Sequence, residues 1–368
     1  MDENILYDSV TKDITTKSGQ YDIVSIGPYQ TSIWAKSGWL TDLTPRATKD
    51  AAYDVNDLIP TVRKSLSDGD KLLAVPFYGE SSFTMYRKDL FDKAGVTMPA
   101  KPTWTQIIDL AKELDDKENG VSGICLRGKP GWGENMALMS TWAHTNGGEF
   151  YDADFKPHLS DPAYVEAATQ YVNLVRNYGE PGAAGASFPE CLTLYTQGKT
   201  AMWVDATVAA SLIEDESQSK VVGKSAYVPS PVLKTADSGW LWAWALGIPE
   251  TSKNKEAAWT FAAWATSKDY HKLVGEKLGW SRVPPGARTS TYAVPEYKKA
   301  ASSYAAPTLA AIESGWTNFV AIPEYQGLGT RVSQELTAAI AGKQTVADAM
   351  AKGQQYAEQT AKDGGYGK

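Results

Sequence analysis

The hydrophobic pattern is clearest between residues 72 and 114, where two apolar runs flank a short polar segment and a helical pattern follows. Residues 72–76 and 83–86 are apolar and aromatic enough for buried strands, and polar residues join them. Thr103 and Gln106 have the spacing of a capping box, and apolar residues then recur every three or four positions up to Leu114. The pattern predicts two strands joined by a polar crossing, followed by a helix over 103–114.

Similar patterns along the rest of the chain alternate between helix and strand. At 239–248, Trp240, Trp242 and Trp244 alternate with other apolar residues, which predicts a strand with three indoles on one face. These indoles fit a core as well as they fit the wall of a binding site. The other predicted strands are 21–26, 120–126 and 200–205, and the other predicted helices are 4–18, 136–145, 161–178, 188–197, 252–275, 327–341 and 345–360. The alternation is typical of an α/β fold.

Length and composition limit the class of protein. A chain of 368 residues is too long for one ordinary core and predicts two domains. It is 43% hydrophobic and 21% charged, as in a globular protein, and no apolar run approaches the roughly 20 residues that span a bilayer. The net charge of −7 argues against nucleic acid as a partner, because binding phosphates requires clustered Lys and Arg.

The sequence gives little indication of a metal site or a phosphate-binding loop. Cys125 and Cys191 fit one disulfide or two buried thiols, and spacing does not decide between them. There is no Cys-x-x-Cys and the three histidines are scattered, so we expect no metal and no cofactor. Residues 123–129 have the spacing of a phosphate-binding loop, but Pro130 replaces its Ser or Thr and removes an N–H donor.

Several polar residues have both a structural and a functional interpretation. Glu80, between two buried strands, either pairs with a structural cation or faces a polar ligand. Asp205 either caps the following helix or faces a binding site. Arg282 either forms an ion pair at the surface or donates hydrogen bonds to vicinal hydroxyls of a ligand. The 13 Trp and 19 Tyr either fill cores or stack on the C–H faces of sugars.

Four motifs resemble one family. They are YRKDLFDKAG followed by PTW at 86–104, RGKPGWGEN at 127–135, GKTAMWVDA at 198–206 and VPPG at 283–286. Together they resemble the maltose-binding-like solute-binding proteins of bacterial ABC sugar importers, most closely the branch that binds mannitol, sorbitol and related polyols. RGKPGWGEN is the most specific of the four.

The resemblance implies a two-lobed periplasmic-binding-protein fold of type II, with three crossings between α/β lobes. It assigns residues 1–79 and 249–313 to lobe I and residues 80–248 and 314–368 to lobe II. It also implies a ligand in the cleft between the lobes, hinge closure, a permease partner, a monomer, and a location in the periplasm or at the cell surface. Members of the family begin with a further strand-helix-strand unit and a signal peptide, which are absent before residue 4, so we expect a shortened form with unpaired strand edges.

The expected ligand-binding residues combine the resemblance with the rule that ligands gather at the carboxyl ends of strands. They are Tyr29, Gln30, Glu80, Ser81, Ser82, Arg127, Lys129, Trp132, Glu134, Asn135, Trp203, Asp205, Trp240, Trp242, Arg282 and Tyr325. We expect a sugar alcohol as ligand, with a mono- or disaccharide or another small solute as the alternative. A glycoside hydrolase using Glu80 and Glu134 is less favoured, and neither Gly-x-Ser-x-Gly nor His-Glu-x-x-His occurs, so we expect no enzyme.

Overall fold

The computed structural model describes residues 3–367, and the first two residues of the predicted N-terminal segment lie outside that range. The described chain forms two compact units. Unit 1 comprises the residues up to Ser81 and Leu241–Glu313, and unit 2 comprises Ser82–Trp240 and the residues from Ser314 onward. The chain therefore passes from one unit to the other three times. Within the described range, no helix is both long enough and apolar enough to cross a membrane.

Unit 1 is built on a three-stranded antiparallel sheet in the order β1 (Val24–Ile26), β9 (Trp242–Gly247) and β4 (Ala74–Glu80). Strand β9 pairs with both neighbours and so belongs wholly to unit 1. The boundary expected after residue 248 therefore lies before residue 241, because the ladder bonds of β9 are made to β1 and β4. As expected for a short sheet, β1 and β4 are its edge strands, each with one partner among the described strands.

Helices cover this sheet, and one predicted helix is divided in two. The pattern at 252–275 forms α11 (Lys255–Ala265) and α12 (Lys268–Leu278). The break occurs because Ser267 caps α12, its side chain accepting a hydrogen bond from the Tyr270 amide. The remaining elements of unit 1 are α1 (Glu3–Thr16), α2 (Pro28–Lys36), α3 (Thr44–Lys49), α4 (Pro60–Ser65), β2 (Ser67–Asp68), β3 (Lys71–Leu72), α13 (Pro295–Ala300) and α14 (Ala305–Ser314).

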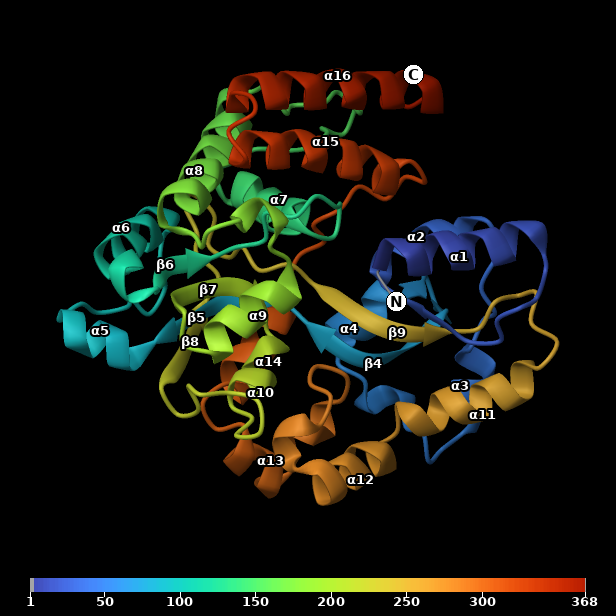
Figure 1. Ribbon diagram of the computed structural model, residues 1–368. Helices are drawn as coiled ribbons and strands as arrows, with labels where there is room; N and C mark the ends of the chain where they lie inside the picture. The colour runs from blue at the N-terminus through green and yellow to red at the C-terminus, as the bar shows by residue number, and fades with distance from the viewer. Residues whose placement is uncertain (1–2, 368) are drawn as a thin grey trace. The chain divides into compact units, whose positions relative to one another are not determined.

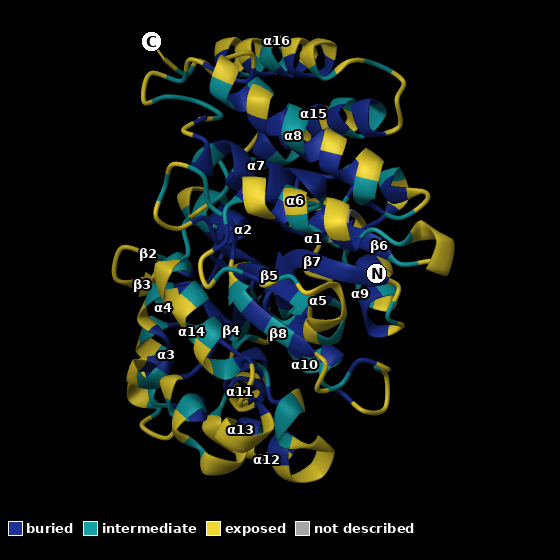
Figure 2. Ribbon diagram, turned by 90° about the vertical axis from the view of Figure 1, so that its left-hand side faces the viewer, coloured by how far each residue is buried: buried dark blue, intermediate teal, exposed yellow. Residues whose placement is uncertain are grey.

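Unit 2 contains a four-stranded sheet in the order β6 (Ser122–Cys125), β7 (Thr200–Ala206), β5 (Ser82–Arg87) and β8 (Ser225–Pro229). Strand β7 runs parallel to β6 and antiparallel to β5. Every residue of β7 is buried, which Figure 2 shows as a dark blue arrow. The carboxyl ends of the parallel strands β6 and β7 therefore lie at the same edge, where Arg127 and Asp205 occur.

The helices of unit 2 surround this sheet. The predicted capping box begins α6 (Trp104–Leu114): Thr103 Oγ1 accepts from the Gln106 amide at 3.2 Å, and Gln106 Oε1 accepts from the Thr103 amide at 2.9 Å. Helices α15 (Tyr325–Ile340) and α16 (Val346–Gly364) pack against each other along their lengths (Figure 1). The others are α5 (Lys88–Ala94), α7 (Asn135–Thr145), α8 (Pro162–Tyr178), α9 (Phe188–Thr196) and α10 (Ala209–Ile213).

Candidate functional site

A buried ion pair lies at the edge of the unit 2 sheet. Arg127 donates to both carboxylate oxygens of Asp205, from Nε at 2.9 Å and from Nη2 at 2.6 Å. Asp205 is fully buried, and its carboxylate also accepts from Trp203 Nε1 at 3.2 Å and from the Ala206 amide at 2.7 Å. The cap interpretation of Asp205 is wrong, because α10 starts at Ala209 and Asp205 is committed to Arg127. The bidentate geometry fixes the plane of the guanidinium.

Other groups complete a charge-balanced cluster around Arg127. Arg127 Nη1 donates to the Gly133 carbonyl at 2.8 Å and lies 3.8 Å from Glu134 Oε2. Lys129 Nζ lies 3.8 Å from the other Glu134 oxygen. The Phe188 ring lies 5.6 Å from Arg127 Cζ, a cation–π distance. The cluster thus combines two cations and two anions with an aromatic face, and it comes from motifs that are far apart in the sequence.

Trp132 and Tyr325 form an aromatic contact in unit 2. Their ring centroids lie 6.3 Å apart in an edge-to-face arrangement. Gly329 makes this contact possible, because a Cβ there would lie only 2.9 Å from Trp132 Cβ. Burial raises the pKa of Tyr325 to about 12, so its hydroxyl stays protonated and able to donate. The two residues offer a ring face and a hydroxyl, which are the groups expected for a sugar-like ligand.

Three expected residues of unit 2 instead bond within the unit. Asn135 is fully buried, with its Nδ2 donating to Thr337 Oγ1 at 2.8 Å and its Oδ1 accepting from Ser333 Oγ. Ser82 Oγ lies 2.7 Å from Ser230 Oγ. Trp203 is also fully buried, and its indole N–H orients Asp205. These side chains position neighbours, and Trp203, which the GKTAMWVDA motif placed in the expected site, acts through its bond to Asp205.

Unit 1 gathers a second group of expected residues at the start of α2. Gly27, Tyr29 and Gln30 follow the end of β1, and Gln30 Oε1 accepts from the Gly27 amide at 3.2 Å. The Trp242 ring occupies the space into which a Cβ on Gly27 would project, so the ring lies directly against this turn. Gln30 Nε2 is buried and has no hydrogen-bond partner among the described residues, which leaves a donor to be satisfied.

The polar crossing ends beside the same strand. Glu80, 7% exposed, is opposite Trp242 in the register of β4 and β9, and Ser81 follows it. The loop of the VPPG motif touches β4, where the Gly79 amide donates to the Pro285 carbonyl at 2.9 Å. Arg282, in this loop, is exposed. Unit 1 therefore brings Glu80, Trp242 and the start of α2 to one end of its sheet.

The three indoles predicted for one strand face do not stay together. Trp242 and Trp244 lie on β9 with ring centroids 6.2 Å apart. Trp240 belongs to unit 2, where it forms an isolated bridge with Trp316. The predicted strand is shorter than its apolar pattern because the chain leaves unit 2 at this point.

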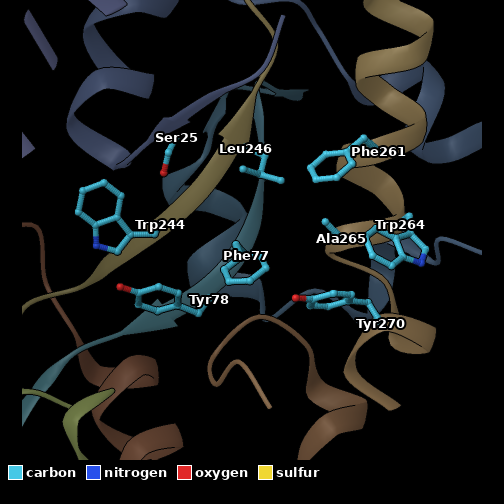
Figure 3. A pocket seen from close by; sticks show the side chains of 9 residues that line it. All are labelled: Ser25, Phe77, Tyr78, Trp244, Leu246, Phe261, Trp264, Ala265 and Tyr270. Atoms are coloured by element: carbon cyan, nitrogen blue, oxygen red, sulfur yellow. The ribbon is translucent and has the colours of Figure 1, made fainter. Parts of the chain in front are cut away.

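Each unit also contains a cavity that the sequence did not indicate. The unit 1 cavity of about 410 Å³ is apolar and mostly aromatic, and the side chains of β4, β9, α11 and α12 face it in Figure 3. Its few polar groups make it unsuited to a polyol. The unit 2 cavity of about 360 Å³ includes Tyr325, and His144 stacks on Trp316 at 4.0 Å beside it. Burial lowers the pKa of His144, which favours its neutral form.

The arrangement of motifs, sheets and charged cluster can be compared with known proteins. The family described as bacterial extracellular solute-binding protein matches residues 4–272. The chain belongs to this family. This solute-binding protein is 42% identical, over 100% of its own length and 86% of the relative's, to the mannitol-binding protein of Pseudomonas aeruginosa.

Solved structures of related proteins agree with this assignment. One is an ABC transporter solute-binding protein from Agrobacterium vitis with bound D-mannitol, with 46% identity, a TM-score of 0.97, and coverage of 100% of this chain and 91% of that one. Another, from Agrobacterium radiobacter in complex with ribitol, has 28% identity, a TM-score of 0.88, and coverage of 98% and 90%. The expected two-lobed solute-binding fold is confirmed.

Family membership also decides two broader expectations. The chain is a solute-binding transport component and not an enzyme, so the hydrolase interpretation of Glu80 and Glu134 is set aside. The protein functions outside the cytoplasm, as members of an extracellular family do. Cys125 and Cys191 form a disulfide with a Cα–Cα distance of 5.6 Å, which suits an oxidising compartment.

Proposed function

We propose that this chain is the substrate-binding component of an ABC importer for a sugar alcohol of the mannitol, sorbitol or arabitol type. The observation that carries the proposal is the buried Arg127–Asp205 pair with Glu134 and Lys129 around it. The two cations and two anions balance, so the cluster favours a neutral ligand over an anion or a cation. A polyol hydroxyl both donates and accepts, and can therefore bond to either kind of group.

The comparisons support the choice of ligand class. A relative that is 42% identical is a mannitol-binding protein, and a related structure that is 46% identical contains D-mannitol. The more distant ribitol complex, at 28% identity, contains another linear polyol. A mono- or disaccharide remains the second candidate, because Trp132 and Trp242 also suit the faces of pyranose rings.

Each unit offers its own candidate groups for a ligand. Those of unit 1 are Glu80, Trp242 and the donor of Gln30, and those of unit 2 are the Arg127 cluster, Trp132 and Tyr325. A ligand that binds one conformation of the protein more tightly than another shifts the population towards that conformation, and the membrane permease then recognises the ligand-bound form. We propose a location in the periplasm or at the cell surface, and a monomer.

Calorimetry with a panel of solutes tests the proposal. We expect binding heat with at least one of D-mannitol, D-sorbitol and D-arabitol, and much weaker binding of glucose and maltose. D-mannitol 1-phosphate has the same carbon chain and tests the preference for a neutral ligand, so we expect it to bind at least about tenfold more weakly than D-mannitol. Strong binding of glucose or maltose with none of any polyol would refute the proposal.

A further inference from the structure

Three side chains from separate elements of unit 2 meet close to one another. Cys125 ends β6, Cys191 lies in α9, and Glu180 follows the end of α8. One ligand atom from each lies within 4.8 Å of the other two. Both cysteines are fully buried and are joined by the disulfide. Sequence spacing indicated no metal site here, because 66 residues separate the two cysteines and only the fold brings them together.

The Glu180 carboxyl is unusual in its surroundings. Both of its oxygens are buried, and among the described residues no other group donates a hydrogen bond to either. Burial raises the pKa of Glu180 to about 7, although its own backbone amide acts in the opposite direction. A buried carboxyl without partners costs free energy. Disulfide sulfurs carry no hydrogen, so the oxidised pair beside Glu180 cannot donate to it.

We propose that reduction of the Cys125–Cys191 disulfide creates a binding site for a soft divalent cation, Zn²⁺ or Cd²⁺, with Glu180 as the third ligand. Two thiolates and a carboxylate match the preference of these ions, and water completes a tetrahedral site. Bonds of about 2.0–2.3 Å place tetrahedral ligand atoms about 3.3–3.8 Å apart. In the oxidised protein the two sulfurs are bonded and so lie closer than this, and a Glu180 oxygen lies within 4.8 Å of both. Rotation of the freed cysteines must therefore move the sulfurs apart to the tetrahedral spacing.

The chemistry balances in two steps. A trialkylphosphine and one water reduce the disulfide: phosphorus takes the oxygen and becomes a phosphine oxide, and the two sulfurs take the two protons and become thiols. The cation then displaces both thiol protons, together with the carboxyl proton in those molecules where Glu180 is protonated. The complex of M²⁺ with two thiolates and one carboxylate has a net charge of −1, and its formation releases three protons from the protonated form of Glu180 and two from the ionised form. The carboxylate of Glu180 thereby gains a cation as its partner.

Cadmium titration of the reduced protein tests the site. The full chain is reduced with a phosphine, desalted without oxygen and titrated with Cd²⁺, while the thiolate-to-cadmium charge-transfer absorbance is recorded. We expect one Cd²⁺ per folded chain, no absorbance from the oxidised protein, and a higher melting temperature of the reduced protein in Cd²⁺. Glu180→Gln should bind at least about tenfold more weakly. The matched control Glu113→Gln, at an exposed position of α6, should bind like the wild type.

Several results would overturn the proposal. One is the absence of charge-transfer absorbance from the folded reduced protein. Others are equal Cd²⁺ affinity in Glu180→Gln, or equal affinity in the wild-type chain unfolded in urea, since each would remove the built site. If reduction unfolds the protein, the proposal requires Cd²⁺ to restore the far-ultraviolet circular dichroism, and failure to restore it counts against the site. D-mannitol binding is measured separately on the oxidised protein, so the two proposals fail independently.

Discussion

Replacing Asp205 with Asn tests the central feature of the proposed site. The carboxylate accepts from four donors: Nε and Nη2 of Arg127, Nε1 of Trp203 and the Ala206 amide. Each oxygen serves one donor of Arg127, so an amide NH₂ in place of either oxygen faces two donors. The substitution removes two hydrogen bonds and the negative charge that pairs with Arg127 most closely, since the Glu134 carboxylate lies farther away, at 3.8 Å. Breaking a buried ion pair in this way costs about 3–5 kcal/mol.

Urea unfolding, followed by circular dichroism, measures this loss. A matched control is Glu256→Gln, which breaks the Arg46–Glu256 pair on the surface of unit 1, where the Glu256 side chain is 81% exposed. We expect no measurable change from the control, because exposed pairs contribute little. The double variant Arg127→Met/Asp205→Leu removes both charges and should recover most of the stability without recovering binding. If Asp205→Asn unfolds at the wild-type urea concentration and binds D-mannitol with wild-type affinity, our account of the pair is wrong.

Three further predictions address the rest of the chain. Trp132→Ala and Glu80→Ala should each weaken D-mannitol binding at least about tenfold, with a native circular dichroism spectrum showing that the chain still folds; wild-type affinity by calorimetry would exclude that residue from ligand contact. Gly27→Ala should displace the Trp242 ring and weaken D-mannitol binding, because the new Cβ would occupy the place of the ring. The backbone at Gly27, with φ −115°, accommodates alanine. A ligand-induced change in tryptophan fluorescence equal to that of the wild type would contradict this prediction. Burial lowers the pKa of His271 from 6.5 to about 4. As the pH falls, the unfolded state therefore takes up the proton first. The free energy of unfolding should decrease between pH 6.5 and pH 4, by up to about 3 kcal/mol. In His271→Gln this pH slope of the unfolding free energy should flatten, and an unchanged slope would refute the assignment.

Local signals in the sequence predicted much of the fold, because they act between neighbouring residues. The capping box at Thr103 and the helical periodicity after it are contained within a dozen positions, and the structure has the helix that they predict. The pattern over 252–275 does not reveal the break, because helix-forming and apolar residues continue past Ser267, whose capping role depends on one hydrogen bond. Trp240 was placed with Trp242 because alternation does not show where a chain leaves a domain.

Sequence patterns do not predict which residues the side chains of the site bond to. Asp205 lies 78 positions after Arg127, and no local spacing connects them. Asn135 was selected by its place in a specific motif, but its amide is satisfied by residues of α15 about 200 positions later. A motif shows which segments approach a site, whereas tertiary contacts decide which of its side chains remain available for a ligand.

The disulfide and the proposed binding group are connected through two elements of unit 2. Cys125 precedes Arg127 by two positions at the end of β6, and Cys191 lies one helical turn after Phe188 on α9. One covalent bond therefore ties together the two segments that hold the guanidinium and the ring beneath it. With Asp205 and the Gly133 carbonyl fixing its other bonds, Arg127 is ordered before any ligand arrives. Because ordering a long side chain on binding costs about 0.5–1.5 kcal/mol, a preorganised guanidinium leaves more of its hydrogen-bond energy for affinity.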